Sequence, residues 1–325
     1  AQGRPLSPGA ARAAVLGLFA AFFSLLALPR VQAEPGLWGA VLGAGVALAL
    51  WVGWAALQAR KAGRRLGVEW TPRRHHVVQL AVQASIYVYW GWHWQPVLPQ
   101  LPLILGQVGF AYLFDLGLSW RRYGNFRLGL GPWPVVGSTN LFLWLRDPLF
   151  GWQLAMIAAM YLAREYLKWE RGGRKVHIFN PSAFGLTLAA AALIATGTVH
   201  LSWGELISES LGYGDMAFEQ MFLAAVVSQL FFGVTVVPLS AAAALVGLGY
   251  GYYWITGAWF FIDTSIPIAV FLSLNLLITD PVSSPYSAGG KALFGALYAV
   301  GVMVLFVGLR LIEQVPTDSD PGLTA

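Results

Sequence analysis

Long runs of apolar residues, separated by short polar segments, dominate the chain from residue 13 to residue 312. A bilayer core about 30 Å thick needs about 20 apolar residues in each helix that crosses it. The runs lie at about 13–29, 37–57, 77–95, 101–118, 128–145, 149–166, 182–199, 218–237, 239–257, 262–279 and 291–312. They do not alternate apolar and polar residues as the strands of a membrane barrel do. The pattern therefore predicts an all-α integral membrane protein with about ten or eleven transmembrane helices.

The composition agrees with this prediction. Hydrophobic residues make up 57% of the chain and charged residues only 11%, whereas a soluble domain carries roughly 25% charged residues. The absence of cysteine excludes disulfides, thiolate-bound zinc, Cys-ligated iron–sulfur clusters and cysteine nucleophiles. The net charge of +5 is small and its basic residues cluster in short loops, so we expect a lipid bilayer as partner and no nucleic acid.

Three loops are strongly basic, at about 58–76, 119–127 and 164–177. Two predicted spans separate each loop from the next, so all three can lie on one side of the membrane. The positive-inside rule makes that side cytoplasmic, and we expect a multi-pass protein of a bacterial inner membrane. The segment 200–217 carries Glu205, Glu209 and Asp215 without Lys or Arg, which places it on the opposite side.

The first apolar run is interpreted as a transmembrane helix and not as a signal peptide, because the residues after it make a poor cleavage site. The sequence then predicts a single transmembrane helical domain at 1–312, with halves at about 13–166 and 178–312. The acidic segment 313–325 is predicted to be a disordered tail.

One pattern occurs twice. Pro134 precedes an apolar run that ends at Asp147-Pro148, and Pro267 precedes one that ends at Asp280-Pro281, with the same offset of 133 residues. The two copies run in opposite directions by the span count. This favours an inverted-topology repeat with broken helices, whose matching interruptions point to a central site. The alternative is that Asp-Pro simply ends two helices, since proline disfavours helix at the residue before it.

Two segments carry candidate site residues. Asn180 or Ser182 can cap the helix after the third basic loop, and Pro181 suits its first turn. Alternatively, the free amide groups at this helix start hold an anionic or carbonyl-bearing group. Thr279, Asp280 and Pro281 form the second segment. Asp280 can pair with Lys291 or a loop arginine, or accept hydrogen bonds from a cofactor, and residue types do not decide between these.

The remaining ionisable residues suggest little chemistry. Asp115 lies in a predicted span, but it is close enough to the basic loop to pair there. The five histidines offer no convincing pair at matched depth, so haem is not expected. We also expect no metal site.

The segment Phe179-Asn180-Pro181-Ser182-Ala183-Phe184-Gly185 resembles the Asn-Pro segment of the NqrB/RnfD family. These are membrane subunits of the sodium-pumping NADH:quinone reductase and of the Rnf electron-transport complex. Thr279-Asp280-Pro281-Val282-Ser283, followed by a Gly-containing turn and Phe294-Gly295-Ala296, is similar to the family's second signature. The resemblance is clearest from about 128 to 310. It implies an inverted repeat of five-helix units, flavin, and electron transfer through the membrane.

The chain departs from the family at the flavin-attachment motif. Members with covalent FMN carry a Gly-Ala-Thr sequence, which does not occur here; Gly233-Val234-Thr235 is the nearest approximation. We therefore predict no covalent FMN. The resemblance implies a non-covalent flavin (riboflavin or FMN) or a quinone instead. The expected site residues are Asn180, Pro181, Ser182, Thr279, Asp280, Pro281 and Asp147.

Three functions compete on this evidence. The first is an electron-relaying subunit of a membrane oxidoreductase. The second is a cofactor-free structural or assembly subunit of a larger membrane complex, since a fold can persist without its chemistry. The third is a carrier for an ion or small solute. The first two imply other subunits of a membrane complex as partners.

Overall fold

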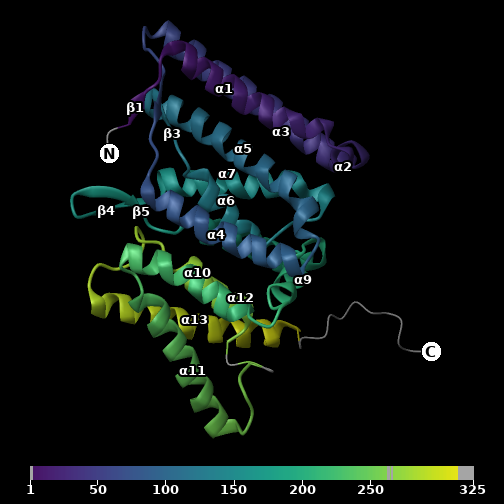
Figure 1. Cartoon of the computed structure of the whole chain (residues 1–325), viewed down its shortest axis with the longest axis vertical. Coiled ribbons are helices and arrows are strands. Elements are labelled where there is room, and N and C mark those ends of the chain that lie inside the picture. Colours follow the sequence, from purple (N-terminus) through teal and green to yellow (C-terminus); the bar gives the residue numbers. More distant parts are fainter. Residues whose placement is uncertain (1–2, 262–263, 265, 314–325) are drawn as a thin grey trace. The chain divides into compact units, whose positions relative to one another are not determined.

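The computed structural model describes residues 3–261, 264 and 266–313, and it is mostly helical (Figure 1). The described residues form thirteen α-helices, with three short 3-10 helices and five short strands in the connections. The chain divides into two compact units, Ala1–Phe232 (unit 1) and Gly233–Ala325 (unit 2), which we describe separately. The predicted tail from 314 onward and the first two residues of the predicted span 262–279 lie outside the described residues.

Five helices are long and apolar enough to cross a membrane. They are Pro8–Ala27, Pro35–Lys61, Val97–Tyr123, Val236–Thr256 and Ala288–Leu311. Two further apolar helices, Pro181–Ala195 and Ala217–Phe232, are shorter. The helices support the predicted multi-pass membrane protein, while the count of ten or eleven spans stays a prediction.

Unit 1 contains ten α-helices, several of which begin at a proline. Their bounds are α1 Pro8–Phe23, α2 Pro29–Ala33, α3 Pro35–Lys61, α4 Arg74–His93, α5 Val97–Tyr123, α6 Pro132–Asn140, α7 Phe150–Tyr166, α8 Pro181–Ala195, α9 Gly204–Ser210 and α10 Ala217–Phe232. The 3-10 helices are η1 Ser24–Ala27, η2 Asp147–Leu149 and η3 Val199–Leu201. Proline suits the first turn because the amide hydrogen that it lacks has no partner there.

Short strands link the basic loops of unit 1. β2 (Gly67–Trp70) in the first loop pairs in parallel with β3 (Asn125–Leu128), at the end of the second, and β1 (Arg4–Pro5) joins β2 antiparallel. β4 (Lys168–Arg171) and β5 (Arg174–His177) form a hairpin in the third loop. The structure is thus mostly helical, as expected, with short strands in these loops, where backbone groups satisfy one another by pairing.

The third basic loop reaches the second through side chains. Glu165, beside the third loop, accepts a hydrogen bond from Tyr123 and pairs with Arg122 at 3.1 Å. Arg164 pairs with Asp115 at 2.7 Å, so Asp115 is paired, but with an arginine of the third basic loop and not with one of the second loop, which is nearer in sequence. All three basic loops thus gather at one end of unit 1, which we call the basic end. Which side of the membrane this end faces stays a prediction.

The opposite end of unit 1, which we call the distal end, carries α2, η2 and α9. The helices between them run alternately from one end to the other, as Figure 1 shows for α3, α4 and α5. The last of them, α10, packs along α4. Its start lies at the distal end, where Tyr89 bonds to Met216, and its last residue, Phe232, contacts His75 at the basic end.

Many large apolar side chains of unit 1 point outward. Leu50, Val88, Leu223 and Leu230 each expose more than 60% of their surface. Contact between water and a large apolar surface is unfavourable, and soluble monomers rarely expose large contiguous apolar patches. A lipid environment removes this penalty, so the exposed side chains agree with the hydropathy of the helices.

Unit 2 contains α11 (Val236–Thr256), α12 (Ile268–Leu276) and α13 (Ala288–Glu313). α11 and α13 pack along one another, and Leu245, Leu274 and Ala299 form a buried core with Phe260 and Phe261. Lys291 donates a hydrogen bond to the Gly233 carbonyl oxygen at one end of the unit.

The boundary between the compact units differs from the boundary between the predicted halves. The units divide after Phe232, whereas the halves were expected to divide between 166 and 178. The division into compact units does not test whether the two halves share an internal symmetry, so the inverted repeat stays a prediction.

A half-buried histidine at the basic end, His76, predicts a pH dependence of stability. Burial, with the nearby charges of His75, Arg73 and Arg164, lowers the pKa of His76 from its usual 6.5 to about 4. The folded state therefore keeps this imidazole neutral between pH 4 and 6.5, where the unfolded chain protonates it. The free energy of unfolding is expected to fall as the pH is lowered through that window.

Unfolding midpoints in detergent, measured between pH 7 and 4, test this prediction. His76→Gln should flatten the pH dependence, whereas the exposed control His200→Gln should keep it. An equal slope in the wild type and in His76→Gln would contradict the assignment.

Candidate functional site at the broken helices

Both predicted broken helices are broken in the structure. α6 ends at Asn140, and the chain leaves the helix before η2 and α7. α12 ends at Leu276, and residues 277–287 are not helical before α13 begins. Each half-helix has nine residues and is therefore about 14 Å long. That length is less than half of a bilayer core.

Side chains of α6 explain where it stops. Ser138, Thr139 and Asn140 each donate a hydrogen bond, of 2.7–2.9 Å, to the backbone carbonyl four residues earlier. Side chains that bond to local carbonyls compete with the helical ladder. The three acceptors also serve amides within α6, so three shared acceptors in succession weaken its last turn, and the helix ends at Asn140.

Polar side chains near the end of α12 also donate hydrogen bonds to backbone carbonyls of their own helix. Ser273 donates to the Val270 carbonyl at 2.9 Å, and Asn275 donates to the Phe271 carbonyl at 2.8 Å. Thr279, in the following turn, bonds back to Asn275 at 2.8 Å. Polar side chains at the ends of both half-helices thus replace the continuing helix, which the Asp-Pro pairs alone did not reveal.

The irregular segment after α6 obtains its hydrogen bonds from α7 and from the loop between α8 and α10, which we call the distal loop. Buried Gln153 accepts from the Leu145 amide at 3.1 Å and donates to the Leu143 carbonyl at 3.2 Å. The segment also pairs with the distal loop through Trp203, whose amide donates to Trp144 at 2.7 Å. Irregular backbone at membrane depth is tolerated only where protein or water satisfies it.

A buried amide pair lies at the end of α6. Asn140 donates to Gln107 Oε1 at 2.7 Å and accepts from Gln107 Nε2 at 3.3 Å. Both residues are buried. An unpaired buried amide is costly, so the two side chains stabilise one another and join α5 to α6.

The start of α8 is a capped helix end. The Asn180 side chain accepts from the amides of Ser182 and Ala183, and Pro181 occupies the first turn. Ser182 donates to the Val135 carbonyl at 3.0 Å, which ties α8 to α6. The capping interpretation is confirmed. The two amides that an anion would use are already bonded to Asn180.

Replacing Asn180 with alanine is expected to lower the free energy of unfolding by about 1 kcal/mol, because two amides at the helix start lose their acceptor. Asn180→Asp should retain most of the cap. Thermal unfolding in detergent compares them, and equal midpoints for wild type and Asn180→Ala would contradict the capping role.

Asp147 lies at the other end of unit 1. Arg30 binds both of its carboxylate oxygens, at 2.7 and 2.6 Å, and also donates to Gln100 at 3.0 Å. Asp147 precedes α7 and Asn180 follows it. The 17 residues of α7 separate the two by about 25 Å. The structure therefore does not bring Asp147 together with Asn180 and Ser182.

The second group of predicted site residues belongs to unit 2. Asp280 accepts hydrogen bonds from the amide and hydroxyl of Ser283, at 3.0 and 2.8 Å. Thr279 is buried and Pro281 is half-buried. These residues form a compact turn between α12 and α13. They lie in a different unit from Asn180, Pro181 and Ser182.

A cluster of four tryptophans at the distal end was missed by the sequence analysis. Trp90, Trp94, Trp144 and Trp203 lie with ring centroids 5.2–6.5 Å apart. Arg146 lies 4.3 Å over the Trp203 ring. Trp144 is buried, and within the described residues its Nε1 has no hydrogen-bond partner. The aromatic segment Trp90-Gly-Trp-His-Trp94 is the part of this cluster that the sequence shows directly.

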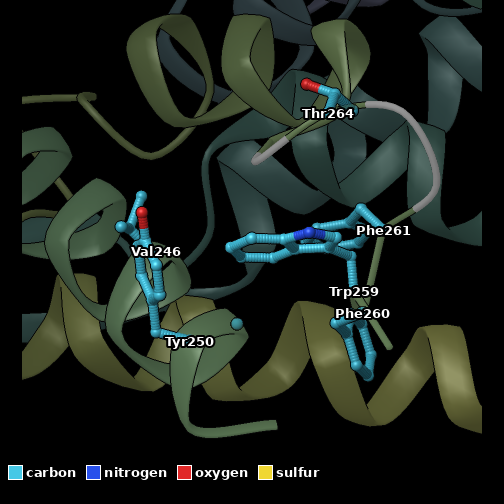
Figure 2. Close-up of a pocket in the computed structure, with 7 residues that line it drawn as sticks. Val246, Tyr250, Trp259, Phe260, Phe261 and Thr264 are labelled. Carbon is cyan, nitrogen blue, oxygen red and sulfur yellow. The ribbon is translucent and has the colours of Figure 1, made fainter. Parts of the chain in front are cut away.

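Unit 2 has a small aromatic hollow beside the end of α11 (Figure 2). Its walls include Tyr250, Trp259, Phe261 and Thr264, and the Trp259 ring extends toward Tyr250. The empty volume is about 240 Å³, including space open to solvent. Only about 10 Å³ of it can hold the centre of a water molecule, which is about the space of one water. The hollow is therefore too small to enclose a flavin.

The described parts of the chain hold no cluster of metal-binding side chains. There, no three His, Asp or Glu side chains gather in a way that could hold a metal ion. The amide pair, the capped start of α8 and the tryptophan cluster are the polar and aromatic features that accompany the broken α6.

The comparisons with known proteins give no match. No protein-family model matches the chain, and no curated protein or solved structure is significantly similar to it. The resemblance to the NqrB/RnfD family thus depends on the two short signatures alone, and any function must be argued from the geometry.

Proposed function

We propose that this chain is an NqrB/RnfD-like membrane subunit of an electron-transport complex, which binds a flavin or quinone non-covalently and relays electrons. The observation that carries the proposal is the pair of nine-residue half-helices, each followed by Asp-Pro and then by a long helix. Interrupted helices at matching positions are where membrane proteins place central binding sites.

The course of the chain supports eleven membrane crossings. In unit 1, eight segments run between the basic and distal ends: α1, α3, α4, α5, α6 with its irregular continuation, α7, α8 and α10. In unit 2, α11, α12 with residues 277–287, and α13 run between the end that holds Lys291 and the end where Arg310 bonds to Phe260. Non-helical chain, which includes the turn at Thr279–Pro281, follows each half-helix. With the basic end in the cytoplasm, this arrangement satisfies the positive-inside rule.

The tryptophan cluster is a better candidate binding site for a planar, carbonyl-bearing ring than the site residues that the sequence predicted. Asn180 caps α8 and Asp147 is held by Arg30, so both are already engaged. Trp94 and Trp203 are half-exposed, and the buried Trp144 Nε1 has no acceptor among the described residues. A flavin or quinone carbonyl would supply that acceptor, and the indole faces would stack on its ring. The bound group would supply the redox chemistry.

The alternative function is a cofactor-free structural subunit of a larger membrane complex. The polar groups around α6 favour it, because Gln107 pairs with Asn140, Ser138 with Ser182, and Asp147 with Arg30. A framework whose polar groups satisfy one another needs no ligand to be stable.

Cofactor analysis of the purified, full-length protein separates the two functions. The protein is denatured, and the extract is examined for flavin and quinone by absorption and mass spectrometry. The proposal predicts about one flavin or quinone per chain. It also predicts that Trp144→Phe, which removes only the indole N–H, lowers this occupancy while the exposed control Trp92→Phe does not. Extracts without either cofactor would contradict the proposal and favour the structural function.

A further inference from the structure

The basic end of unit 1 presents a concentrated positive surface. Its exposed basic residues are Arg60, Lys61, Arg64, Arg65, Arg73, Arg74, Arg121, Arg122, Arg127 and Lys175. The nearby carboxylates offset little of this charge. Asp115 and Glu165 are already paired with Arg164 and Arg122, which leaves Glu69 and Glu170. Because β2 and β3 pair, the first two loops are held together and their charges act on one region.

Within this surface, one arginine is positioned at the groove between two long helices. Arg121, in the last turn of α5, lies with its guanidinium carbon 5.0 Å from the centre of the Trp54 ring on α3. The two helices approach closely one turn earlier, where a methyl group at Gly117 would lie 3.0 Å from Trp51 Cε3. The missing side chain at Gly117 lets α3 and α5 pack tightly, and this places Trp54 beneath Arg121.

Arg121 keeps its hydrogen-bonding edge for a ligand. Stacking on an indole uses the face of the guanidinium and leaves its N–H donors directed outward. Among the described residues, no carboxylate lies within ion-pair distance of Arg121, in contrast to Arg122 beside it. Planar guanidinium groups bind phosphate oxygens through two parallel hydrogen bonds.

The surroundings of Arg121 match the boundary of a membrane. Trp54 is 44% exposed, and the exposed Leu50 lies one turn further along α3, away from the basic end. Tryptophan is enriched at the depth of the lipid headgroups, with apolar side chains below it. Lys61 follows Trp54 by two helical turns and adds a second positive charge above it.

We propose that the Arg121–Trp54 groove between α3 and α5 binds the phosphate of an anionic phospholipid, whose acyl chains lie along Leu50. Positive clusters at the cytoplasmic end of apolar helices attract anionic headgroups. The groove adds a fixed donor and an aromatic floor to that attraction. The proposal does not depend on the electron-transport function.

The full-length protein in nanodiscs of mixed phosphatidylglycerol and phosphatidylcholine tests this proposal. Native mass spectrometry measures which lipids remain bound as detergent is added. The wild type should retain phosphatidylglycerol in preference to phosphatidylcholine. Arg121→Gln should weaken this preference about fivefold, and Arg121→Lys should weaken it less. Arg127→Gln removes one charge from the same end but not from the groove, so it should behave as the wild type.

Three results would overturn the proposal. The first is equal lipid retention in Arg121→Gln and Arg127→Gln. The second is complete displacement of phosphatidylglycerol by inorganic phosphate, which would show that a free anion is the ligand. The third is an acidic protein that co-purifies only when Arg121 is present. Should Arg121→Gln fail to fold, Arg121→Lys decides alone: retention equal to that of the wild type would contradict the need for guanidinium.

Discussion

Replacing Gln153 with methionine is expected to lower the free energy of unfolding by about 2–4 kcal/mol, because two buried backbone groups lose their partner at once. Gln153 accepts from the Leu145 amide and donates to the Leu143 carbonyl. Methionine has a similar volume but can replace neither bond. In a bilayer no water is present to satisfy the freed groups, so the irregular segment after α6 should lose its structure first.

Unfolding in detergent micelles by heat or by added dodecyl sulfate measures this effect. Gln58→Met is the matched control, since Gln58 is exposed on α3. A loss in Gln153→Met no larger than in Gln58→Met would show that the side chain does not support the broken helix.

Replacing Gly295 with leucine is expected to lower the free energy of unfolding by about 3 kcal/mol, because α11 and α13 could no longer pack at their present distance. A Cβ atom at Gly295 would lie 2.3 Å from the Val237 carbonyl oxygen and 2.9 Å from the Ala241 amide nitrogen. Both atoms belong to the backbone of α11, so no side-chain rotation relieves the clash.

The control for this change lies on the same helix. A Cβ atom at Gly301 would meet nothing within 4 Å in the described residues, so Gly301→Leu adds the same apolar side chain without a clash. Its unfolding midpoint should stay near that of the wild type. If the two variants were equally stable, the close contact between α11 and α13 would not exist in the membrane.

The sequence predicted the features that depend on local patterns. Hydropathy located the long helices, because each needs its own apolar stretch. Pro134 and Pro267, each with a later Asp-Pro, indicated two interrupted segments, and both are broken in the structure. Asn180 followed by Pro181 indicated the capped start of α8, because caps depend on residues next to one another.

Features that depend on residues far apart in the chain could not be predicted. Asp147 was assigned to a binding site, but its partner Arg30 lies 117 residues away. The strands β2 and β3 also pair across a long separation, with Gly67 opposite Asn125. The tryptophan cluster combines residues from α4, the segment after α6 and the distal loop. No local pattern distinguishes these tryptophans from ones that face lipid.

The chain contains no cysteine, so single-cysteine labelling can test directly whether unit 1 spans a membrane with its basic end in the cytoplasm. Ala62→Cys and Lys175→Cys place a thiol in two separate loops of the basic end, and Glu205→Cys places one at the distal end. All three positions are exposed. Each variant is treated with a membrane-impermeant maleimide, in bacterial spheroplasts and in inverted membrane vesicles. We expect Ala62→Cys and Lys175→Cys to react only in the inverted vesicles, and Glu205→Cys only in the spheroplasts. Reaction of Ala62→Cys and Lys175→Cys from opposite sides, or of all three from the same side, would contradict the membrane arrangement described here.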